Sequence, residues 1–392
     1  MIPYARQDIS EDDIEAVVAI LRSDWLTQGP SGEMFEKKLA SYCGAAHAVS
    51  VSSATAALHL SYLALDLGPG DLLWTSPNTF VATANAARFC GANVDFVDVE
   101  LQTANLSVDA LRRKLEHAER LGRLPKIVVP VHFGGQSCDM KEIAALSAKY
   151  GFRVVEDASH ALGAEYCGER VGSCRYADIA VLSFHAVKII TTGEGGAAMT
   201  NNPELAERVR RLRSHGVVKD TGRIEHASLQ PWLYEQRELG FNYRLTDIQS
   251  ALGASQVGRV DKFVARRRHL AAGYDAELRD LPLTPLAQDP AGRSAWHLYA
   301  IHVRSDEPDA RGKLFADLRA RGIGVNVHYI PVHTQPYYRR LGFRPGDFPH
   351  AEQHYRDAIT LPLYPAMTDA QQATVIDALR GLLDSRGVRG RR

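Results

Sequence analysis

The sequence predicts an α/β fold with a mostly parallel central sheet, helices on both faces of that sheet, and a smaller C-terminal α+β domain. Through the first 200 residues, short apolar segments alternate with helical patterns. The apolar segments are nearly continuous runs of Val, Ile and Leu, which is typical of parallel strands buried on both faces. From about residue 203 the composition shifts to charged helix, and a further long helical pattern then leads to the C-terminal third.

The elements of the first part follow one another in a regular order. A strand at 47–52 leads into a helical pattern in which Leu60, Leu63, Ala64 and Leu67 share one face. Ligands of such sheets bind at the carboxyl ends of the strands, so the residues that follow each strand are the candidates for a site. The further elements expected are strands at 71–76, 93–99, 126–133, 152–158 and 178–184, with a helix at 80–91.

The second part begins with a long helical pattern at 246–278. Beyond it, the segments 297–303 and 323–330 read as strands of the smaller domain. We therefore predict a large domain at 1–250 and a small domain at 251–392.

Composition and charge argue against several classes of protein. Lysine plus arginine and aspartate plus glutamate are equal at 46 each, so no net charge favours nucleic acid or an anionic membrane. No segment approaches the roughly 20 apolar residues that span a bilayer, and the first residues do not resemble a signal peptide. The five cysteines form no C-x-x-C pair and leave an odd thiol, which fits a reducing compartment. We expect a cytoplasmic protein.

Two strand ends carry residues that suit a phosphate and a pyridine. Ser53, Ala54 and Thr55 begin a helix, where free backbone N–H groups and the helix dipole favour an anion. Asp157 ends another strand, where its carboxylate could hold a protonated pyridine nitrogen. An ordinary helix cap is the alternative at both places.

Lys188 lies in the apolar segment "AVKII", where burying an ammonium would be costly. Either it reaches water from a surface strand, or its amine is buried because the chemistry needs it neutral. A desolvated lysine with a lowered pKa is the usual nucleophile for an aldehyde and the usual proton carrier afterwards. A phosphate-binding helix, an acidic strand end and this lysine together describe a pyridoxal phosphate site.

Four segments, "SSATAALHL", "SPNTFVATANAARFCGA", "VVEDASHALGA" and "SFHAVKIITTGEGG", resemble the DegT/DnrJ/EryC1/StrS family of sugar-nucleotide aminotransferases. "GFNYRLTDIQSALG" and "VHYIPVHTQPYY" match too, so the resemblance covers nearly the whole chain. It implies the aspartate-aminotransferase fold type I and pyridoxal 5'-phosphate as cofactor. Within the family the chain looks most like the enzymes of pseudaminic acid biosynthesis. These transfer an amino group from L-glutamate to C4 of a UDP-linked 2-acetamido-2,6-dideoxy-4-hexulose.

The resemblance also implies roles for individual residues of the cofactor site. Lys188 would carry the cofactor covalently and Asp157 would pair with its pyridine nitrogen. Phe80 would stack on the ring, although a core position in a helix is the alternative for this residue. The remaining cofactor-binding residues would be Ser53, Ala54, Thr55 and Ser183 at the phosphate, His160 near the phenolic oxygen, and Asn242 from the neighbouring subunit of a homodimer.

For the substrate, five positions match those that line the sugar-nucleotide pocket in the family: Thr27, Gln28, Gly29, His328 and Tyr329. His185, three residues before Lys188, would shape the surroundings of the amine. Packing in turns and strands is the alternative for all of these residues. Many close relatives carry proline where this chain has Ala186, a difference that should not affect the chemistry.

Three alternative functions would each explain part of this set of residues. Relatives that dehydrate a deoxysugar at C3 replace the lysine with histidine, whereas Lys188 is present here. A catalytically idle sensor or scaffold would not need the lysine, the aspartate and the phosphate-binding residues together. A transaminase acting at C3 or C4 of another nucleotide-linked keto-deoxysugar is the main alternative.

Two further motifs give only weak indications of a binding site. Gly193, Gly195 and Ala198 fit a degenerate dinucleotide fingerprint, but a strand-like segment follows where a helix should begin. His350 and His354 are spaced to share a helix face and could bind a metal, but no third ligand accompanies them. We expect no metal.

Overall fold

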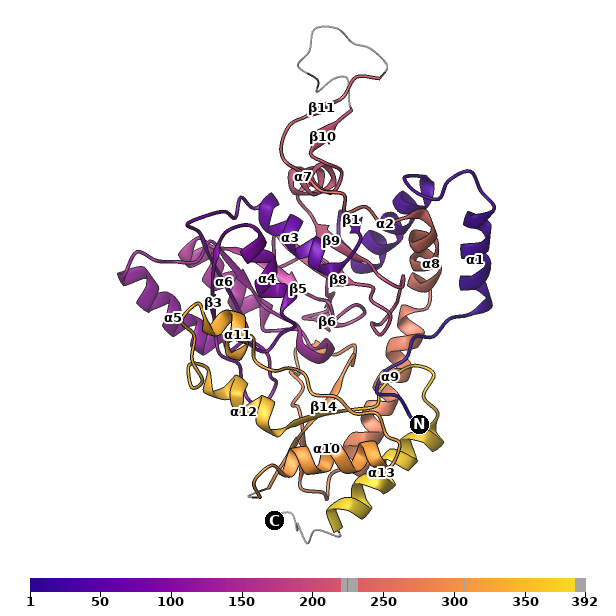
Figure 1. The fold of residues 1–392 in the computed structure, drawn as a ribbon, viewed down its shortest axis with the longest axis vertical. Coiled ribbons are helices and arrows are strands. Elements are labelled where there is room, and N and C mark those ends of the chain that lie inside the picture. The colour runs from indigo at the N-terminus through magenta and orange to yellow at the C-terminus, as the bar shows by residue number, and fades with distance from the viewer. Residues whose placement is uncertain (220–223, 225–231, 306, 385–392) are drawn as a thin grey trace.

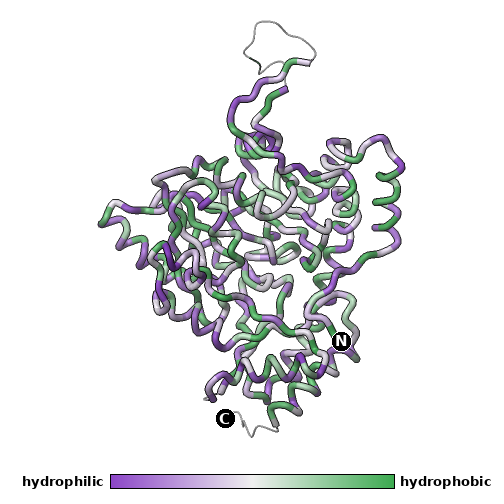
Figure 2. Tube along the Cα trace, in the orientation of Figure 1, coloured by the Kyte–Doolittle hydropathy of each residue, from purple (hydrophilic) through white to green (hydrophobic). Residues whose placement is uncertain are grey.

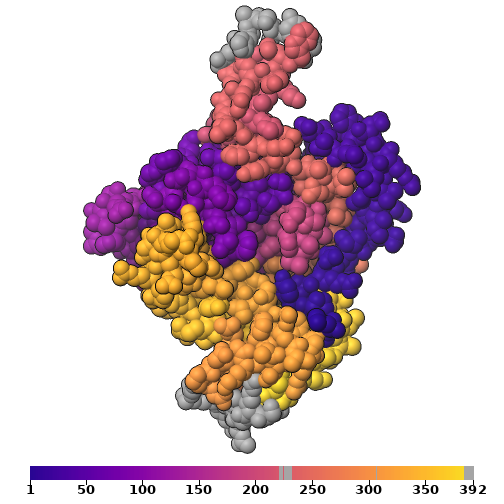
Figure 3. Space-filling model, viewed as in Figure 1, coloured from indigo at the N-terminus to yellow at the C-terminus, as the bar shows by residue number. Residues whose placement is uncertain are grey.

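The computed structural model describes residues 1–219, 224, 232–305 and 307–384. A large upper part contains the central sheet and most of the helices, and a smaller lower part contains α10 and α13 (Figure 1). An arm with β10 (Val217–Val218) and β11 (Glu235–Gln236) extends from the upper part beyond α7 (Figure 1), and it projects from the surface in the space-filling view (Figure 3). The predicted fold class is therefore confirmed, whereas the domain boundary at 250/251 stays a prediction.

The central sheet has seven strands in the order β1-β9-β8-β5-β4-β2-β3. The pairs from β8 to β3 are parallel, and β9 is antiparallel to both of its neighbours. Every strand expected in the first part is present at or within the expected limits. The strands are β1 (His47–Val51), β2 (Leu72–Thr75), β3 (Asn93–Phe96), β4 (Ile127–Val129), β5 (Arg153–Asp157), β8 (Ile179–Ser183) and β9 (Gly196–Thr200).

Alternate residues of the strands pack against different helices, because successive side chains point to opposite faces of a sheet. Ile127 and Val155 pack with α3, α4 and α7, whereas Val128 and Val154 pack with α5 and α6. Both faces are therefore covered, as predicted. The helices are α1 (Glu11–Leu21), α2 (Pro30–Cys43), α3 (Ala54–Ala64), α4 (Ala82–Phe89), α5 (Val108–Arg120), α6 (Met140–Tyr150), α7 (Pro203–Arg213) and α8 (Asp247–Val257).

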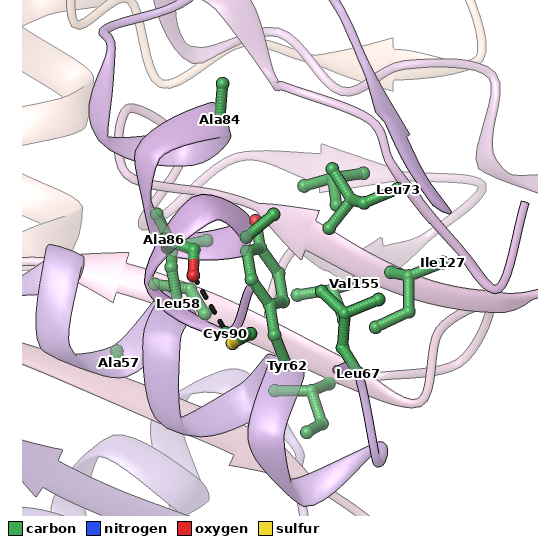
Figure 4. Packing of buried hydrophobic residues seen from close by; sticks show 14 of the residues in the cluster. Ala57, Leu58, Tyr62, Leu67, Leu73, Ala84, Ala86, Cys90, Ile127 and Val155 are labelled. Atoms are coloured by element: carbon green, nitrogen blue, oxygen red, sulfur yellow. Dashed lines mark hydrogen bonds between the residues drawn. The ribbon is translucent and has the colours of Figure 1, made fainter. Parts of the chain in front are cut away.

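Tyr62 of α3 lies within the first of these core clusters, between the helices and the strands (Figure 4). Its hydroxyl donates a hydrogen bond to the Thr83 carbonyl at 3.1 Å. At the other end of α4, Cys90 Sγ bonds to the Ala86 carbonyl at 3.3 Å (Figure 4). The Tyr62 hydrogen bond thus attaches α4 to α3, which sets the position of the residues at the start of α4.

The smaller part has its own core, in which residues of α9, α10 and α13 pack against a three-stranded sheet of order β12-β14-β15. Its elements are α9 (Val260–Glu277), β12 (Leu283–Pro285), β14 (Tyr299–Val303), α10 (Ala310–Ala320), β15 (Ala358–Leu361) and α13 (Asp369–Asp384). Between α10 and β15 the chain returns to the large part, where η3 (Val332–Thr334), α11 (Pro336–Arg339) and α12 (Pro349–Asp357) contribute Val332, Tyr338 and Ala351 to its core. Another small sheet joins β13 (Gly292–Arg293) to the hairpin of β6 (Glu165–Tyr166) and β7 (Glu169–Arg170).

The segment 323–330 was expected to be a strand, and this prediction is wrong. Ile323 pairs with Ile2 and Asn326 pairs with Thr360, each as an isolated bridge. Because its two backbone partners lie on different segments, no continuous ladder forms. The helical pattern at 246–278 is likewise divided, since Arg259 leaves the helical conformation between α8 and α9.

Within the described ranges, no helix is long and apolar enough to cross a bilayer.

Candidate active site

A cavity of about 470 Å³ lies where the carboxyl ends of β5 and β8 meet the N-terminus of α3. Most of the predicted site residues line it, although they come from distant parts of the sequence. They are Ser53, Ala54, Thr55, Phe80, Asp157, His160, Ser183, His185, Lys188, His328 and Tyr329.

Lys188 lies in the loop between β8 and β9, where its backbone N–H donates to the His185 carbonyl at 2.9 Å. Desolvation lowers the pKa of its amine to about 8, and the nearby negative charge of Asp157 opposes part of that shift. The neutral amine is the nucleophilic form, and here it is accessible close to neutral pH. Lys188 thus lines the cavity and is only partly exposed, rather than being a solvated surface lysine.

Asp157 ends β5, and two donors fix its carboxylate. Thr83 donates its hydroxyl to Oδ2 at 2.7 Å, and the Ser159 backbone N–H donates to Oδ1 at 3.2 Å. The carboxylate is buried, and these hydrogen bonds replace the water that it has lost. A fixed anion at this edge of the cavity can hold a cationic nitrogen.

The N-terminus of α3 forms a second edge of the cavity. Ser53 is the N-cap, and its hydroxyl accepts a hydrogen bond from the Ala56 N–H at 3.1 Å. Ala54 and Thr55 begin the helix, where N–H groups have no acceptor within the helix. Gly196 of β9 passes so close that a Cβ there would lie 2.5 Å from the Ala54 nitrogen. The cap and the anion-binding interpretations of this helix start are thus compatible.

The cavity wall is aromatic. Phe80 lies before α4 and is 61% exposed, so it is not a core residue of that helix. The Tyr329 hydroxyl forms a hydrogen bond with His160 Nε2 at 3.1 Å. The Gly134 N–H donates to His160 Nδ1 at 3.3 Å. Burial, with the charge at Lys188, holds the pKa of His160 well below its usual range.

His328 also faces the cavity, and its Nδ1 lies 2.8 Å from the Thr360 hydroxyl. Burial lowers its pKa to about 3, with smaller contributions from Lys188 and His354. Its backbone carbonyl accepts a hydrogen bond from His354 Nε2 at 2.9 Å, while His354 Nδ1 lies 2.8 Å from His302 Nε2. His354 therefore supports the wall of the cavity, and no candidate metal-ligand group occurs in the described ranges.

Four predicted site residues lie outside this cavity. Thr27 pairs with Thr246 as an isolated bridge, and the Gly29 N–H donates to Asp247 Oδ2 at 2.8 Å. Asn242, which is exposed, pairs with Ser214. The loop of Thr27, Gln28 and Gly29 is thus attached to the start of α8, a few residues after Asn242. The roles of these residues stay predictions.

Several cavity residues were missed from the sequence, among them Tyr4, Thr83 and His297. Thr83 follows Phe80 by three residues, and this helical spacing could have placed both on one face. Tyr4 and His297 carry no local signal, because they reach the cavity from the N-terminal segment and from the start of β14. The glycine motif after Lys188 leads into strand β9 rather than a helix, as expected.

The arrangement fits a phosphorylated pyridine aldehyde. The start of α3 provides a cradle for a phosphate, which a side chain at Gly196 would fill. Asp157 provides the fixed anion, Phe80 an exposed aromatic face and Lys188 the amine. Residues that could hold each part of such a group are therefore present in one cavity.

Comparison with known proteins agrees with this chemistry. A model of the DegT/DnrJ/EryC1/StrS aminotransferase family matches residues 7–380. The spore coat polysaccharide biosynthesis protein SpsC of Bacillus subtilis is 40% identical over 389 residues, which cover 97% of both chains. The UDP-4-amino-4,6-dideoxy-N-acetyl-beta-L-altrosamine transaminase of Campylobacter jejuni is 37% identical over 386 residues, 98% of both chains.

Among solved structures, PseC of Helicobacter pylori matches with a TM-score of 0.90 and 31% identity, covering 98% of this chain and 99% of that chain. It is described as an aminotransferase involved in the biosynthesis of pseudoaminic acid.

Proposed function

This chain belongs to the DegT/DnrJ/EryC1/StrS aminotransferase family, and we propose that it aminates C4 of a UDP-linked 4-keto-6-deoxy-N-acetylhexosamine with L-glutamate as the amino donor. Enzymes of this family are pyridoxal phosphate-dependent sugar aminotransferases, and pyridoxal phosphate is the cofactor of this chain. The observation that carries the reaction type is that Lys188, whose amine has a lowered pKa, lines the same cavity as the fixed carboxylate of Asp157.

The choice of sugar draws support from two names among the similar proteins, the UDP-amino-sugar transaminase and PseC. SpsC is slightly more identical, and its name points to a polysaccharide instead. Amination at C3 or C4 of another nucleotide-linked keto-deoxysugar is therefore the second candidate.

Bound pyridoxal phosphate supplies the electron sink that stabilises a carbanion, which no amino acid side chain provides. Ala54, Thr55 and Ser183 would hold its phosphate, Phe80 would cover its ring, and Asp157 would hold its pyridine nitrogen.

The chemistry assigned to the protein itself is proton transfer. Lys188 Nζ would remove the proton from Cα of glutamate and, in the second half of the reaction, deliver a proton to C4 of the keto-sugar. General acid–base catalysis of this kind contributes about 100- to 10,000-fold. A pKa of about 8 suits both tasks, since the amine can then exist in either form near neutral pH.

We further propose a homodimer in which Asn242 of one chain completes the other chain's site. Asn242 is exposed, and it pairs with Ser214, which lies between α7 and the β10 strand of the projecting arm. Helix α1 carries several hydrophobic residues at one edge of the molecule (Figure 2), and two of them, Ile14 and Leu21, are 46% and 57% exposed. All five cysteines are free, which fits the cytoplasm as the location.

One experiment tests the substrate. Purified protein is incubated with L-glutamate and a panel of UDP- and dTDP-linked 4-keto-sugars, and the amino-sugar product is identified by mass spectrometry and NMR. Selective amination of the UDP-linked 4-keto-6-deoxy-HexNAc at C4 is expected. Amination of only another sugar would favour the second candidate, and turnover by Lys188→Ala at the wild-type rate would refute the mechanism.

A mixing experiment tests the shared site. Lys188→Ala and Asn242→Ala are prepared separately, and each is expected to be impaired. Mixed dimers would contain one site with both residues intact, so mixing should restore part of the activity. No recovery in a mixture that exchanges subunits would contradict the proposal.

A further inference from the structure

His297 lines the active-site cavity and has an unused hydrogen-bonding atom. It is only 3% exposed, and its Nδ1 has no hydrogen-bond partner. A buried polar atom without a partner is unfavourable, because it has lost its water and gained nothing in return. Nδ1 is closed to solvent in this structure, so a turn of the ring about its side-chain bonds would be needed before a ligand group in the cavity supplied the missing partner.

The backbone of His297 is fixed on both sides, so only rotation about its side-chain bonds can bring the imidazole to another partner. The Ala295 N–H donates to the Gly135 carbonyl at 2.9 Å, and the Leu298 N–H donates to the Gly134 carbonyl at 3.1 Å. The buried guanidinium of Arg267 donates to the His297 carbonyl at 3.2 Å. The backbone here is also closely packed, since a Cβ on Gly135 would lie 2.9 Å from the backbone nitrogen of His297.

The imidazole of His160 lies next to His297 and differs from it in hydrogen bonding. The ring centroids of His160 and His297 are 4.5 Å apart, but both nitrogens of His160 already have partners. Burial, together with His160 and the charge at Lys188, holds the pKa of His297 well below its usual range. His297 is therefore neutral and can donate one N–H.

An unpartnered nitrogen alone would not be enough, since His333 Nδ1 is also buried without a partner and lines no active-site wall. The composition of the cavity supplies the second argument. Among the lining residues in the described part of the chain, Lys188 is the only lysine or arginine, and its amine is needed for proton transfer. An amino-acid donor brings carboxylates into this cavity, and they require N–H donors from another source.

We propose that His297 binds a carboxylate of the amino-acid donor through its Nδ1–H, and that it thereby positions the donor for proton removal by Lys188. This inference rests on the proposed transamination but not on the identity of the sugar. Because His297 enters from the start of β14 while Lys188 and Asp157 belong to the central sheet region, donor binding would involve both parts of the chain.

The test measures binding of glutarate, an unreactive dicarboxylate, to the pyridoxal phosphate-loaded protein by calorimetry and by the cofactor's absorption. His297→Phe keeps a ring but removes both nitrogens, and the Kd for glutarate is expected to rise about 10- to 100-fold, the value of one hydrogen bond to a charged group. His297→Asn carries an amide near the Nδ1 position and should recover most of the affinity. His297→Gln carries it near the Nε2 position and should not.

The matched control is His333→Phe, which removes the other buried histidine with an unpartnered Nδ1 and should leave glutarate binding unchanged. In steady-state assays, His297→Phe should raise the KM for glutamate without raising the KM for the sugar.

An unchanged glutarate Kd in His297→Phe, or no difference between the Asn and Gln variants, would overturn the proposal, as would a wild-type protein that does not bind glutarate. Loss of cofactor with unchanged glutarate binding in the loaded fraction would instead assign His297 to the cofactor and also refute it. If the Phe variant does not fold, the comparison of Asn with Gln decides. Glutarate binding needs no sugar, so a failed sugar assignment would leave this result interpretable.

Discussion

The close approach of β9 to the start of α3 allows one prediction to be worked through in detail. Gly196 passes so near to α3 that a Cβ would lie 2.5 Å from the Ala54 nitrogen, 2.6 Å from the Ser53 carbonyl carbon and 2.7 Å from the Ala54 Cα. Carbon contacts are optimal at about 3.5–4.0 Å, so Gly196→Ala requires the two backbone segments to separate by about 1 Å. Overpacking of this kind costs about 1–3 kcal/mol of stability.

The same separation would disturb the N–H groups of Ala54 and Thr55 that we expect to bind the phosphate. A hydrogen bond to a charged group contributes about 1.5–3 kcal/mol, so the loss of one raises the Kd for pyridoxal phosphate roughly 10- to 100-fold. Pyridoxal, which lacks the phosphate, should lose much less affinity. Both constants can be measured by equilibrium dialysis with the apoenzyme, alongside urea denaturation.

Gly68→Ala is the matched control, because a Cβ there meets nothing within 4 Å and the backbone is not in the left-handed region. Its stability and cofactor affinity should match the wild type. The reasoning would be refuted if Gly196→Ala bound pyridoxal phosphate as tightly as the wild type, or lost affinity for pyridoxal to the same extent.

Three further predictions concern Lys188 and Asp157. Lys188→Ala should abolish turnover while pyridoxal phosphate still binds non-covalently, so borohydride treatment followed by mass spectrometry should label the wild type but not the variant. The Lys188 pKa is lower in the folded apoenzyme (about 8) than in the unfolded chain (about 10.4), so the unfolded chain binds more protons between these values. The free energy of unfolding of the apoenzyme should therefore increase as pH rises through this window. Lys188→Met should lack this contribution, which urea titrations at several pH values would measure. If the free energy of unfolding of the two proteins changed equally with pH, the lowered pKa would be contradicted. Thr83→Val keeps the shape of the side chain but removes the 2.7 Å hydrogen bond to Asp157, which should cost about 1.5–3 kcal/mol of unfolding free energy and weaken cofactor binding. Wild-type stability in this variant would mean that Asp157 does not depend on Thr83.

Much of the site could be predicted because local patterns mark strand ends. Asp157 and Ser183 each end a buried strand, and Ser53 follows one, so the carboxyl-end rule for parallel sheets places all three at the same edge. Lys188 was recognisable because a charged residue in an apolar segment needs a reason to be there. These inferences require only the strand periodicity and the order of the elements.

Other features depend on contacts between segments that are distant in the sequence. The segment 323–330 has the alternation of a strand, yet its backbone partners, Ile2 and Thr360, lie on two different segments and no ladder forms. Nothing next to Gly196 in the sequence indicates that it must pass within contact distance of α3.

By itself, the sequence determined the fold class, the order of the strands and helices, and the residues that supply the amine and the carboxylate, because periodicity and strand ends are local properties of a chain. The tertiary structure alone decided that Thr83 fixes Asp157, that His297 reaches the cavity with an unpaired nitrogen, and that Thr27, Gln28 and Gly29 lie beside α8 instead of in the cavity. Those facts arise from packing between distant segments, and the energy of such packing is not encoded in any short stretch of residues.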